Sequence, residues 1–321
     1  MTVRLPEAAT DLLQASADVW ISPHDRALTT AELHAAVGGV DGAVVSLGNR
    51  VDNAFLDASG PRLRVVANIG VGYDNVDVVA CAARGVVVTN TPGVLTDATA
   101  DLAFALILMS TRRLGEAERL VRDRRPWRFG LDFMLGTGIG GKTLGIVGLG
   151  TIGKKVAKRA QAFDMHVQYY DIIRLTEHQE DALDVRFVLF PELLRTSDVV
   201  SLHVPLSQAT RGMMGSREFA MMKRSAILIN TCRGPVVDEA ALQVALASGQ
   251  IAAAGLDVMV EVPPAANHPM FGLENITITP HSAGPTWENW AKAFRNAFDN
   301  VQRVAAGRKP LWVIPELQDL L

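Results

Sequence analysis

The stretch LGIVGLGTIG, residues Leu144–Gly153, decides the fold. Its first four residues are almost wholly apolar, which is typical of a strand buried on both faces of a parallel sheet. Gly148, Gly150 and Gly153 follow in GxGxxG spacing, and the helical pattern of Lys154–Phe163 comes directly afterwards. Such glycines allow a tight turn, close approach of the backbone to a pyrophosphate and close helix–strand packing, while the helix N-terminus offers N–H groups to phosphate. The stretch therefore predicts a dinucleotide site, with Thr151 and Ile152 beginning the helix.

An acidic residue after the next predicted strand bears on which dinucleotide binds. The run His166–Tyr170 is followed by Asp171, 18 residues beyond Gly153. A carboxylate at this place accepts hydrogen bonds from ribose hydroxyls and repels a 2′-phosphate. Arg174 lies three residues further on and offers a 2′-phosphate an alternative partner. We expect NAD, and NADP is the less favoured alternative.

Short β-branched runs alternate with helix-length amphipathic stretches through the rest of the chain. This alternation predicts an α/β fold with parallel sheets. The predicted strands are Ala43–Leu47, Leu63–Ile69, Val86–Asn90, Thr143–Gly148, Met165–Tyr170, Val199–His203, Ala226–Asn230, Ile251–Asp257 and Ile276–Thr279.

The order of the long helices predicts two Rossmann-like domains. The apolar helix Asp97–Thr111 follows a boundary near Thr91–Gly93, and a last long helix, Thr286–Ala306, comes after every element that the dinucleotide domain needs. We therefore expect a discontinuous, flavodoxin-like substrate domain formed by residues 1–94 and 285–321. Residues 95–284 would form the dinucleotide-binding domain, and the active site would lie in the cleft between the two domains.

Composition excludes several classes of protein. The chain has 321 residues, of which 49% are hydrophobic and 20% charged, so a large core is available and disorder is excluded. The net charge of -3 does not favour nucleic acid, and no apolar run approaches the roughly 20 residues of a membrane span. The two cysteines, Cys81 and Cys232, form neither a disulfide framework nor a metal-binding spacing. The first residues, MTVRLPEAATDLL, lack the apolar region of a signal peptide, so we expect a cytoplasmic protein without metal.

Two polar residues at predicted strand ends are candidates for catalysis. Arg233 lies in the turn after the strand Ala226–Asn230, where a guanidinium can clamp a carboxylate with two hydrogen bonds. The alternative is a surface ion pair of Arg233 with Asp238 or Glu239. His281 follows the strand Ile276–Thr279, and an imidazolium there can protonate the oxygen of a carbonyl that receives a hydride. A histidine at a strand end is more often only a satisfied polar residue, but the combination with Arg233 and the glycine turn favours a site.

Several motifs in the same order resemble those of the D-isomer-specific 2-hydroxyacid dehydrogenases, over nearly the whole chain. They are VGYDNVD (71–77), the glycine turn, NTCRGPVVD (230–238), GLDV (255–258) and TPH (279–281). The segments GVLTDATADL (93–102) and NHPMF (267–271) are most similar to the glyoxylate/hydroxypyruvate reductase branch. The resemblance implies reversible hydride transfer between NAD(H) and a small 2-oxo acid.

The resemblance also implies roles for particular residues. Backbone N–H groups near Val71 and Gly72 would hold the substrate carboxylate together with Arg233, and His281 would be the acid/base. The implied cofactor contacts beyond the glycine turn and Asp171 are Val204, Pro205, Thr231, Cys232, Arg233, Asp257, His281 and Gly284. A homodimer through residues 97–140 is implied, in which Phe133 reaches the partner's substrate pocket. The arginine-rich part of this region is interleaved with acids, which favours a solvated face or dimer contact over a nucleic-acid patch.

The sequence departs from the family pattern at Val262, where a glutamate that orients the catalytic histidine is usual. Valine offers no hydrogen bond there, so we expect a lower pKa for His281 unless Glu261, one residue earlier, takes over the role. Adjacent residues of an extended chain point to opposite sides, which weighs against that substitution. Loss of this glutamate favours one alternative, a weakened, NAD-sensing binding protein. A further alternative, which does not depend on this position, is a 3-phosphoglycerate dehydrogenase. The phosphate of 3-phosphoglycerate would need basic residues near Ser46–Arg50, and Arg50 is the one basic residue in this stretch.

Two further expectations concern the ends of the chain. The N-terminus begins at what should follow the family's first strand, so either the start is truncated or Thr2–Arg4 replaces that strand poorly. Trp287 and Trp290 lie just after the segment that contains His281. We expect them to pack at the start of the last helix rather than to narrow the substrate pocket.

Overall fold

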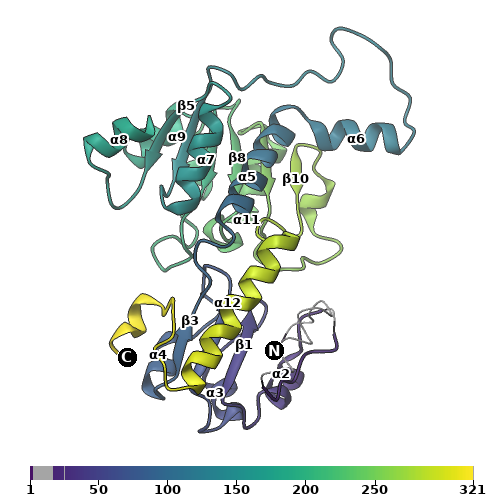
Figure 1. The fold of residues 1–321 in the computed structure, drawn as a ribbon. Helices are drawn as coiled ribbons and strands as arrows, with labels where there is room; N and C mark the ends of the chain where they lie inside the picture. Colours follow the sequence, from purple (N-terminus) through teal and green to yellow (C-terminus); the bar gives the residue numbers. More distant parts are fainter. Residues whose placement is uncertain (3–16, 25, 321) are drawn as a thin grey trace. The chain divides into compact units, whose positions relative to one another are not determined.

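The computed structural model describes residues 1–2, 17–24 and 26–320, and both of its compact units have an α/β fold with parallel sheets (Figure 1). The first unit is Met1–Leu95 with Pro285–Leu321, and the second is Thr96–Gly284. The α/β class predicted from the alternating pattern is confirmed. In the described part of the chain, no helix combines the length and the apolar character that crossing a membrane requires.

The second unit is built on a seven-stranded, wholly parallel sheet. Its strand order is β10-β9-β8-β7-β4-β5-β6, so the chain changes direction across the sheet between β4 and β7. In open α/β sheets such a switch point is where ligands bind, beyond the carboxyl ends of the strands. The strands are β4 (Thr143–Val147), β5 (His166–Tyr170), β6 (Arg186–Phe187), β7 (Val199–Leu202), β8 (Ile227–Asn230), β9 (Ala253–Leu256) and β10 (Ile276–Ile278).

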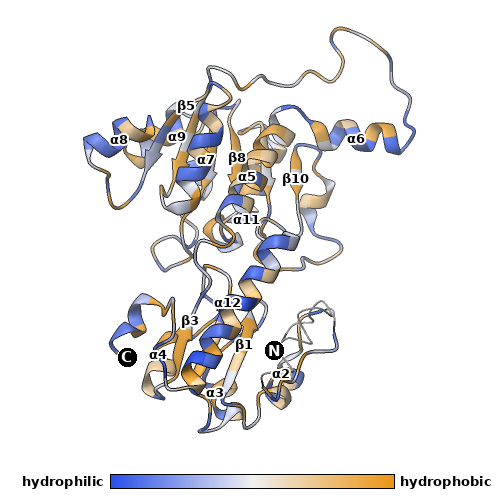
Figure 2. Cartoon of the chain, viewed as in Figure 1, coloured by the Kyte–Doolittle hydropathy of each residue, from blue (hydrophilic) through white to orange (hydrophobic). Residues whose placement is uncertain are grey.

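Helices cover both faces of this sheet. One apolar cluster lies under α5 and α7 and contains Ile146, whereas a second lies under α9, α10 and α11 and contains Val147. Strand β4 is therefore buried on both faces, as its apolar run predicted, and Figure 2 shows strands of both sheets as mainly hydrophobic. The helical segments are α5 (Thr96–Thr111), α6 (Leu114–Arg122), α7 (Thr151–Gln161), α8 (Glu177–Leu183), α9 (Phe190–Thr196), α10 (Ser216–Met221), η1 (Gly234–Val236), α11 (Glu239–Ala247) and η2 (Pro269–Gly272).

The first unit has a parallel sheet of three strands in the order β1-β2-β3. Near the N-terminus, Thr2 donates its N–H to the carbonyl of Val44 in β1 at 3.1 Å, whereas Val3 and Arg4 lie outside the described residues. The elements are α2 (Thr30–Ala36), β1 (Gly42–Ser46), α3 (Asn53–Ser59), β2 (Val65–Ile69), α4 (Val78–Ala83), β3 (Val87–Thr89), α12 (Trp287–Ala305) and η3 (Pro315–Leu320).

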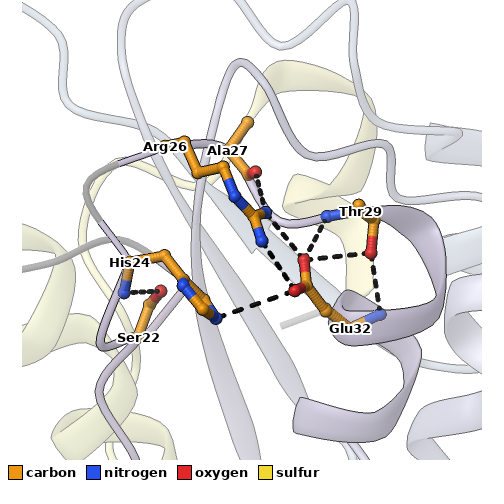
Figure 3. Close-up of polar contacts among 6 residues, drawn as sticks. All are labelled: Ser22, His24, Arg26, Ala27, Thr29 and Glu32. Carbon is orange, nitrogen blue, oxygen red and sulfur yellow. Dashed lines mark hydrogen bonds and ion pairs between the residues drawn. The ribbon is translucent and has the colours of Figure 1, made fainter.

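Side-chain hydrogen bonds at the start of α2 show how this unit fixes a helix end (Figure 3). Thr29 accepts the N–H of Glu32, and the Glu32 carboxylate accepts the N–H of Thr29, which forms a capping box. Arg26 donates to both carboxylate oxygens of Glu32, at 2.7 and 2.8 Å, and His24 lies 3.7 Å away. The hydrogen bonds from Arg26 and Thr29 hold the pKa of the Glu32 carboxyl well below its ordinary range.

The structure corrects the packing expected for Trp287. Its side chain is 86% exposed, whereas Trp290 is half-buried and meets Phe294 edge-on, with ring centroids 5.1 Å apart. The covered face of α12 includes Phe294 and Ala297, which pack in one apolar cluster with β1 and β2. Trp287 is the first helical residue, one turn before Trp290, and it lies outside this cluster.

Candidate active site

The three glycines of the turn after β4 have different surroundings. Gly148 has a φ of +92°, and a Cβ there would lie 2.7 Å from the carbonyl oxygen of His203, so only glycine fits. A Cβ on Gly153 would collide with the carbonyl of Gly148. Because glycine has no Cβ, the start of α7 can pack closely against the end of β4. A Cβ on Gly150 would meet nothing within 4 Å. Open space therefore lies beside Gly150, where the backbone can approach a ligand.

The N-terminus of α7 fits a phosphate at that open side. Gly150 is the N-cap residue and supplies no side-chain cap. Within the described chain, no hydrogen bond occupies the N–H groups of Thr151, Ile152 and Gly153. Unpaired N–H groups and the positive end of the helix dipole together favour an anion. The residues of the turn therefore fit the pyrophosphate of a dinucleotide.

Asp171 lies immediately after β5 and is joined to the glycine turn. One carboxylate oxygen accepts the N–H of Leu149 at 2.8 Å, and the other accepts the N–H of Ile173 at 3.1 Å. The side chain is half-buried, so it remains within reach of a ligand. The acid thus lies where a ribose would follow the pyrophosphate.

Arg174, the alternative partner for a 2′-phosphate, is held elsewhere. Its guanidinium donates to both carboxylate oxygens of Glu180, at 2.9 and 3.1 Å, and lies 5.2 Å from the centre of the Phe187 ring. The hydrogen bond from Arg174 lowers the pKa of the Glu180 carboxyl, and the same bond raises the pKa of Arg174. This arrangement favours Asp171 over Arg174 as the residue that meets the adenosine ribose.

Asn230, the last residue of β8, shapes the turn that presents Arg233. Its side-chain oxygen accepts the N–H of Cys232 at 3.0 Å, and its side-chain nitrogen donates to the carbonyl of Arg233 at 2.9 Å. Burial raises the pKa of the Cys232 thiol to about 11, so this cysteine is a protonated turn residue rather than a nucleophile. The hydroxyl of Thr231 is buried and has no hydrogen-bond partner among the described residues, which fits a group that arrives from a ligand.

Arg233 is half-buried, and one of its guanidinium nitrogens donates to the carbonyl of Cys232 at 2.8 Å. Asp238 and Glu239, the two acids considered as ion-pair partners of Arg233, make other contacts. Asp238 accepts the N–H of Ala241 and caps α11. Glu239 accepts the N–H of Val260 at 2.6 Å and lies 3.5 Å from the His268 ring.

The loop that carries His281 is anchored on Asp257, the residue after β9. The buried Asp257 carboxylate accepts the hydroxyl of Thr279 at 2.6 Å, together with the N–H groups of Ser282 at 2.8 Å and Ala283 at 2.9 Å. His281 itself has a φ of 55°, a left-handed conformation that is uncommon outside glycine. A chain of hydrogen bonds on both sides of His281 thus holds it at the carboxyl edge of the sheet that carries the glycine turn.

A cavity of about 880 Å³ in the second unit is lined by both His281 and Asp257. Val262 lies in its wall and is 54% exposed. Glu261 is exposed and is not among the lining residues, so the structure brings Val262 and not Glu261 to the cavity of His281. Apolar side chains, including Met259, Met270 and Ile278, form much of the remaining wall.

In the first unit, the loop after β2 presents two unoccupied backbone donors. The N–H groups of Val71 and Gly72 have no hydrogen-bond partner in the described part of the chain. Their carbonyls are held instead, because Asn90 donates to Val71 at 2.8 Å and Asn68 donates to Gly72 at 2.9 Å. A pair of adjacent N–H groups on an anchored loop fits a carboxylate.

The remaining predicted residues lie at separate places. Val204 is half-buried and Pro205 is exposed, both just after β7, and Gly284 is the last residue of the second unit. Phe133 is half-buried and its ring stacks on Trp127 with centroids 6.5 Å apart. His203 was not predicted from the sequence; it follows β7, and its ring lies 2.8 Å from the Ser201 hydroxyl. The same sequence pattern that singled out His281, a polar residue at the end of a predicted strand, also applies to His203.

The glycine turn and Asp171, at the switch point of a parallel sheet, define the second unit as the dinucleotide-binding domain of a dehydrogenase. The family model described as "D-isomer specific 2-hydroxyacid dehydrogenase, NAD binding domain" matches residues 104–283. The chain belongs to this family, and the protein is an NAD-dependent oxidoreductase of the glyoxylate-reductase-like type. The family and the cofactor predicted from the sequence are confirmed.

The most similar relatives include two archaeal glyoxylate reductases. The one from Korarchaeum cryptofilum is 44% identical over 84% of this chain and 81% of its own length. The one from Thermococcus gammatolerans is 44% identical over 89% of this chain and 86% of its own length. Among solved structures, the TT0316 protein from Thermus thermophilus superposes with a TM-score of 0.89, at 38% identity over 98% of each chain. The likeness therefore extends through both units.

Proposed function

We propose that the protein catalyses the reversible reduction of a small 2-oxo acid, such as glyoxylate or hydroxypyruvate, to the corresponding 2-hydroxy acid. The observation that carries this proposal is the anchoring of His281 by Asp257. It holds the main chain of His281 at the same sheet edge as the glycine turn, whose N–H groups are proposed to bind the dinucleotide. A positioned imidazole at that edge is what proton transfer to a nascent alkoxide requires.

Each proposed role follows from the chemistry of the residue. The bound NADH supplies the hydride that adds to the carbonyl carbon of the substrate. His281, as imidazolium, donates the proton to the carbonyl oxygen, and in the reverse direction the neutral ring removes it from the hydroxyl. Arg233 and the N–H groups of Val71 and Gly72 bind the substrate carboxylate and so orient the carbonyl.

The proposed dinucleotide site uses the residues of the second unit. The N–H groups at Gly150, Thr151 and Ile152 hold the pyrophosphate, and Asp171 accepts hydrogen bonds from the ribose. Val204 and Pro205 are proposed as further cofactor contacts. On the nicotinamide side the proposed contacts are Thr231, Cys232, Arg233, Asp257, His281 and Gly284.

The proposal assigns the first unit, residues 1–94 with 285–321, to the substrate and residues 95–284 to the cofactor. It includes a homodimer formed through residues 97–140. Two apolar side chains of this region, Phe129 and Leu131, are 93% and 95% exposed, as expected for residues that a partner copy covers. Phe133 would reach the partner's substrate pocket.

The test is a panel of 2-oxo acids assayed for NADH and NADPH oxidation in parallel. We expect turnover of glyoxylate or hydroxypyruvate with a preference for NADH, and a loss of at least about a hundredfold in kcat/KM for His281→Ala and Arg233→Ala. Dinucleotide binding without turnover of any 2-oxo acid would instead support the NAD-sensing alternative. Oxidation of 3-phosphoglycerate would support the third alternative, for which Arg50, paired with Asp52 at 3.1 Å, offers a charge.

A further inference from the structure

The loop that presents Val71 and Gly72 is held by a residue from the far end of the chain. The hydroxyl of Tyr73, next to Gly72, lies 3.1 Å from each carboxylate oxygen of Glu316. The hydroxyl donates and the carboxylate accepts, and a hydrogen bond to a charged acceptor is stronger than one between neutral groups. These two residues are 243 positions apart in the sequence.

Glu316 is a fixed acceptor because the residues on both sides of it are anchored. Ile314 and Leu317 are each 1% exposed and belong to the apolar cluster under α3 and α4. Ile314 also donates its N–H to the carbonyl of Val88 in β3 at 3.1 Å, and Val313 pairs with Thr89. The segment Trp312–Leu317, which we term the C-terminal strap, therefore lies along β3 and holds Glu316 beside the loop.

The strap reaches the loop by a second route through Asn90. The N–H of Asn90 donates to the carbonyl of Trp312 in the strap at 3.1 Å. Its side-chain nitrogen donates to the carbonyl of Val71 at 2.8 Å. Hydrogen bonds therefore hold the loop on both sides of Gly72, at Val71 through Asn90 and at Tyr73 through Glu316. We infer that these two contacts fix the direction of the two unoccupied N–H groups.

We propose that Tyr73 and Glu316 are positioning residues for the carboxylate-binding N–H groups of Val71 and Gly72, so that the C-terminal strap contributes to substrate binding. This inference rests on the proposed function, in which those N–H groups hold the substrate carboxylate. Burial and the neighbouring Glu316 both raise the pKa of Tyr73, which keeps its hydroxyl protonated and able to donate.

The first test is Tyr73→Phe, which keeps the ring and removes the hydroxyl. We expect the KM for glyoxylate to rise about three- to tenfold while kcat changes less than twofold, because the lost contact orients the carboxylate in ground state and transition state alike. The KM for NADH should not change, because the residues proposed for the dinucleotide lie in other segments. A merely structural loss would lower activity without this division between KM and kcat.

Variants at Glu316 provide rescue and control. Glu316→Ala should reproduce Tyr73→Phe, whereas Glu316→Gln keeps an oxygen that accepts the same hydrogen and should restore KM to within about twofold of the original. In the double variant Tyr73→Phe/Glu316→Ala, KM should rise no further than in either single variant, because both remove one interaction. Asp319→Ala, which removes an exposed carboxylate from the same helical turn η3, is the matched control and should have no effect.

A binding measurement separates failure of the inference from failure of the proposed function. Calorimetric titration of the NADH-loaded protein with oxamate, a carboxylate analogue of a 2-oxo acid that accepts no hydride, needs no turnover. If the original protein reduces glyoxylate and Tyr73→Phe leaves both its KM and the oxamate affinity unchanged, the inference is wrong and the proposed function stands. If the original protein reduces no 2-oxo acid, the proposed function is wrong. An unchanged oxamate affinity in Tyr73→Phe and Glu316→Ala then overturns the inference as well, and a three- to tenfold loss supports it.

Discussion

The main-chain N–H of His281 donates to the main-chain carbonyl of Asp257 at 2.9 Å, so the residue that follows β9 directly holds the residue proposed as acid/base. The carboxylate of the same aspartate accepts the N–H groups of the two residues that follow His281. A non-glycine residue in the left-handed region persists only where its surroundings over-determine it. Asp257 provides that constraint, in addition to the nicotinamide-side role expected of it from the family resemblance.

Asp257→Asn should therefore lower kcat by about a hundredfold, because the amide nitrogen repels one of the N–H groups that the carboxylate accepted and His281 then shifts. Glyoxylate reduction under saturating NADH measures this loss. Thr279→Ser keeps the hydroxyl donor and serves as the control, with kcat near the original value. A kcat for Asp257→Asn within twofold of the original would show that the loop holds its shape without the carboxylate.

Val262→Glu should change the pH dependence of reduction. Reduction uses the imidazolium form of His281, and a carboxylate at the wall of the same cavity favours that form and so raises the pKa of the histidine. The pH above which kcat/KM falls should move upward, and the rate at neutral pH should rise. Val262→Gln, which adds similar bulk without charge, separates the effect of charge from that of size. An unchanged profile and rate in Val262→Glu would contradict the expectation.

Much of the fold was predictable because the dinucleotide unit repeats one local pattern. Apolar runs such as Leu144–Val147 are buried on both faces, and runs of this kind are read directly from the sequence. Strand β6 was missed because it contains only Arg186 and Phe187, too few residues for a periodicity, and it lies at the sheet edge. The exposure of Trp287 was missed because helical spacing does not tell where along a helix its packing begins.

The site could be predicted only where a residue with a suitable functional group follows the end of a predicted strand. Arg233 and His281 follow parallel strands, whose carboxyl ends share one edge, so their placement at that edge could be inferred. The anchoring of the His281 loop by the Asp257 side chain could not, because a buried carboxylate with three donors has no local sequence pattern. The pair of Tyr73 and Glu316 is harder still, since it joins two segments from opposite ends of the chain.

Asp171→Asn should weaken NADH binding about tenfold and strengthen NADPH binding, because the amide keeps an acceptor for Leu149 but no longer repels a 2′-phosphate. Adding Glu180→Gln should increase NADPH affinity further, since it weakens the hold on Arg174. Fluorescence titration with each dinucleotide measures both effects. Glu177→Gln, an exposed change on the same helix, is the control. NADPH binding unaltered in both variants would show that neither residue discriminates between the cofactors.

Phe129→Ser combined with Leu131→Ser should convert the proposed dimer to a monomer of 34.5 kDa, because both side chains are almost fully exposed in the single chain. Each buried apolar side chain of this size contributes about 1.5–3 kcal/mol, so losing four across a symmetric interface is a large loss. Sedimentation velocity at micromolar concentration distinguishes the two states. Val79→Ser removes an exposed apolar side chain from α4 in the first unit and should leave the dimer intact. A monomeric original protein would end the dimer proposal.

The stability of the protein should fall between pH 6.5 and 5 because of His203. Burial lowers the pKa of this histidine to about 4, against about 6.5 in the unfolded chain. Above pH 6.5 the ring is mainly neutral in both the folded and the unfolded state, so it does not change the free energy of unfolding. As the pH falls below 6.5 the unfolded chain binds a proton that the folded chain does not, so the free energy of unfolding drops by up to about 1.4 kcal/mol per pH unit until the folded pKa is reached.

His203→Asn should remove most of this slope while keeping a polar partner for Ser201. Urea unfolding at pH 6, 5.5 and 5 gives the slope. This window lies below the pKa of about 6 to which burial lowers the Met1 amine, and above the range in which carboxylates of lowered pKa, such as those of Asp97 and Asp198, titrate. His178→Asn changes an exposed histidine and should keep the original slope. Equal slopes in the original protein and His203→Asn would mean that the folded chain accommodates a charged imidazole at the end of β7.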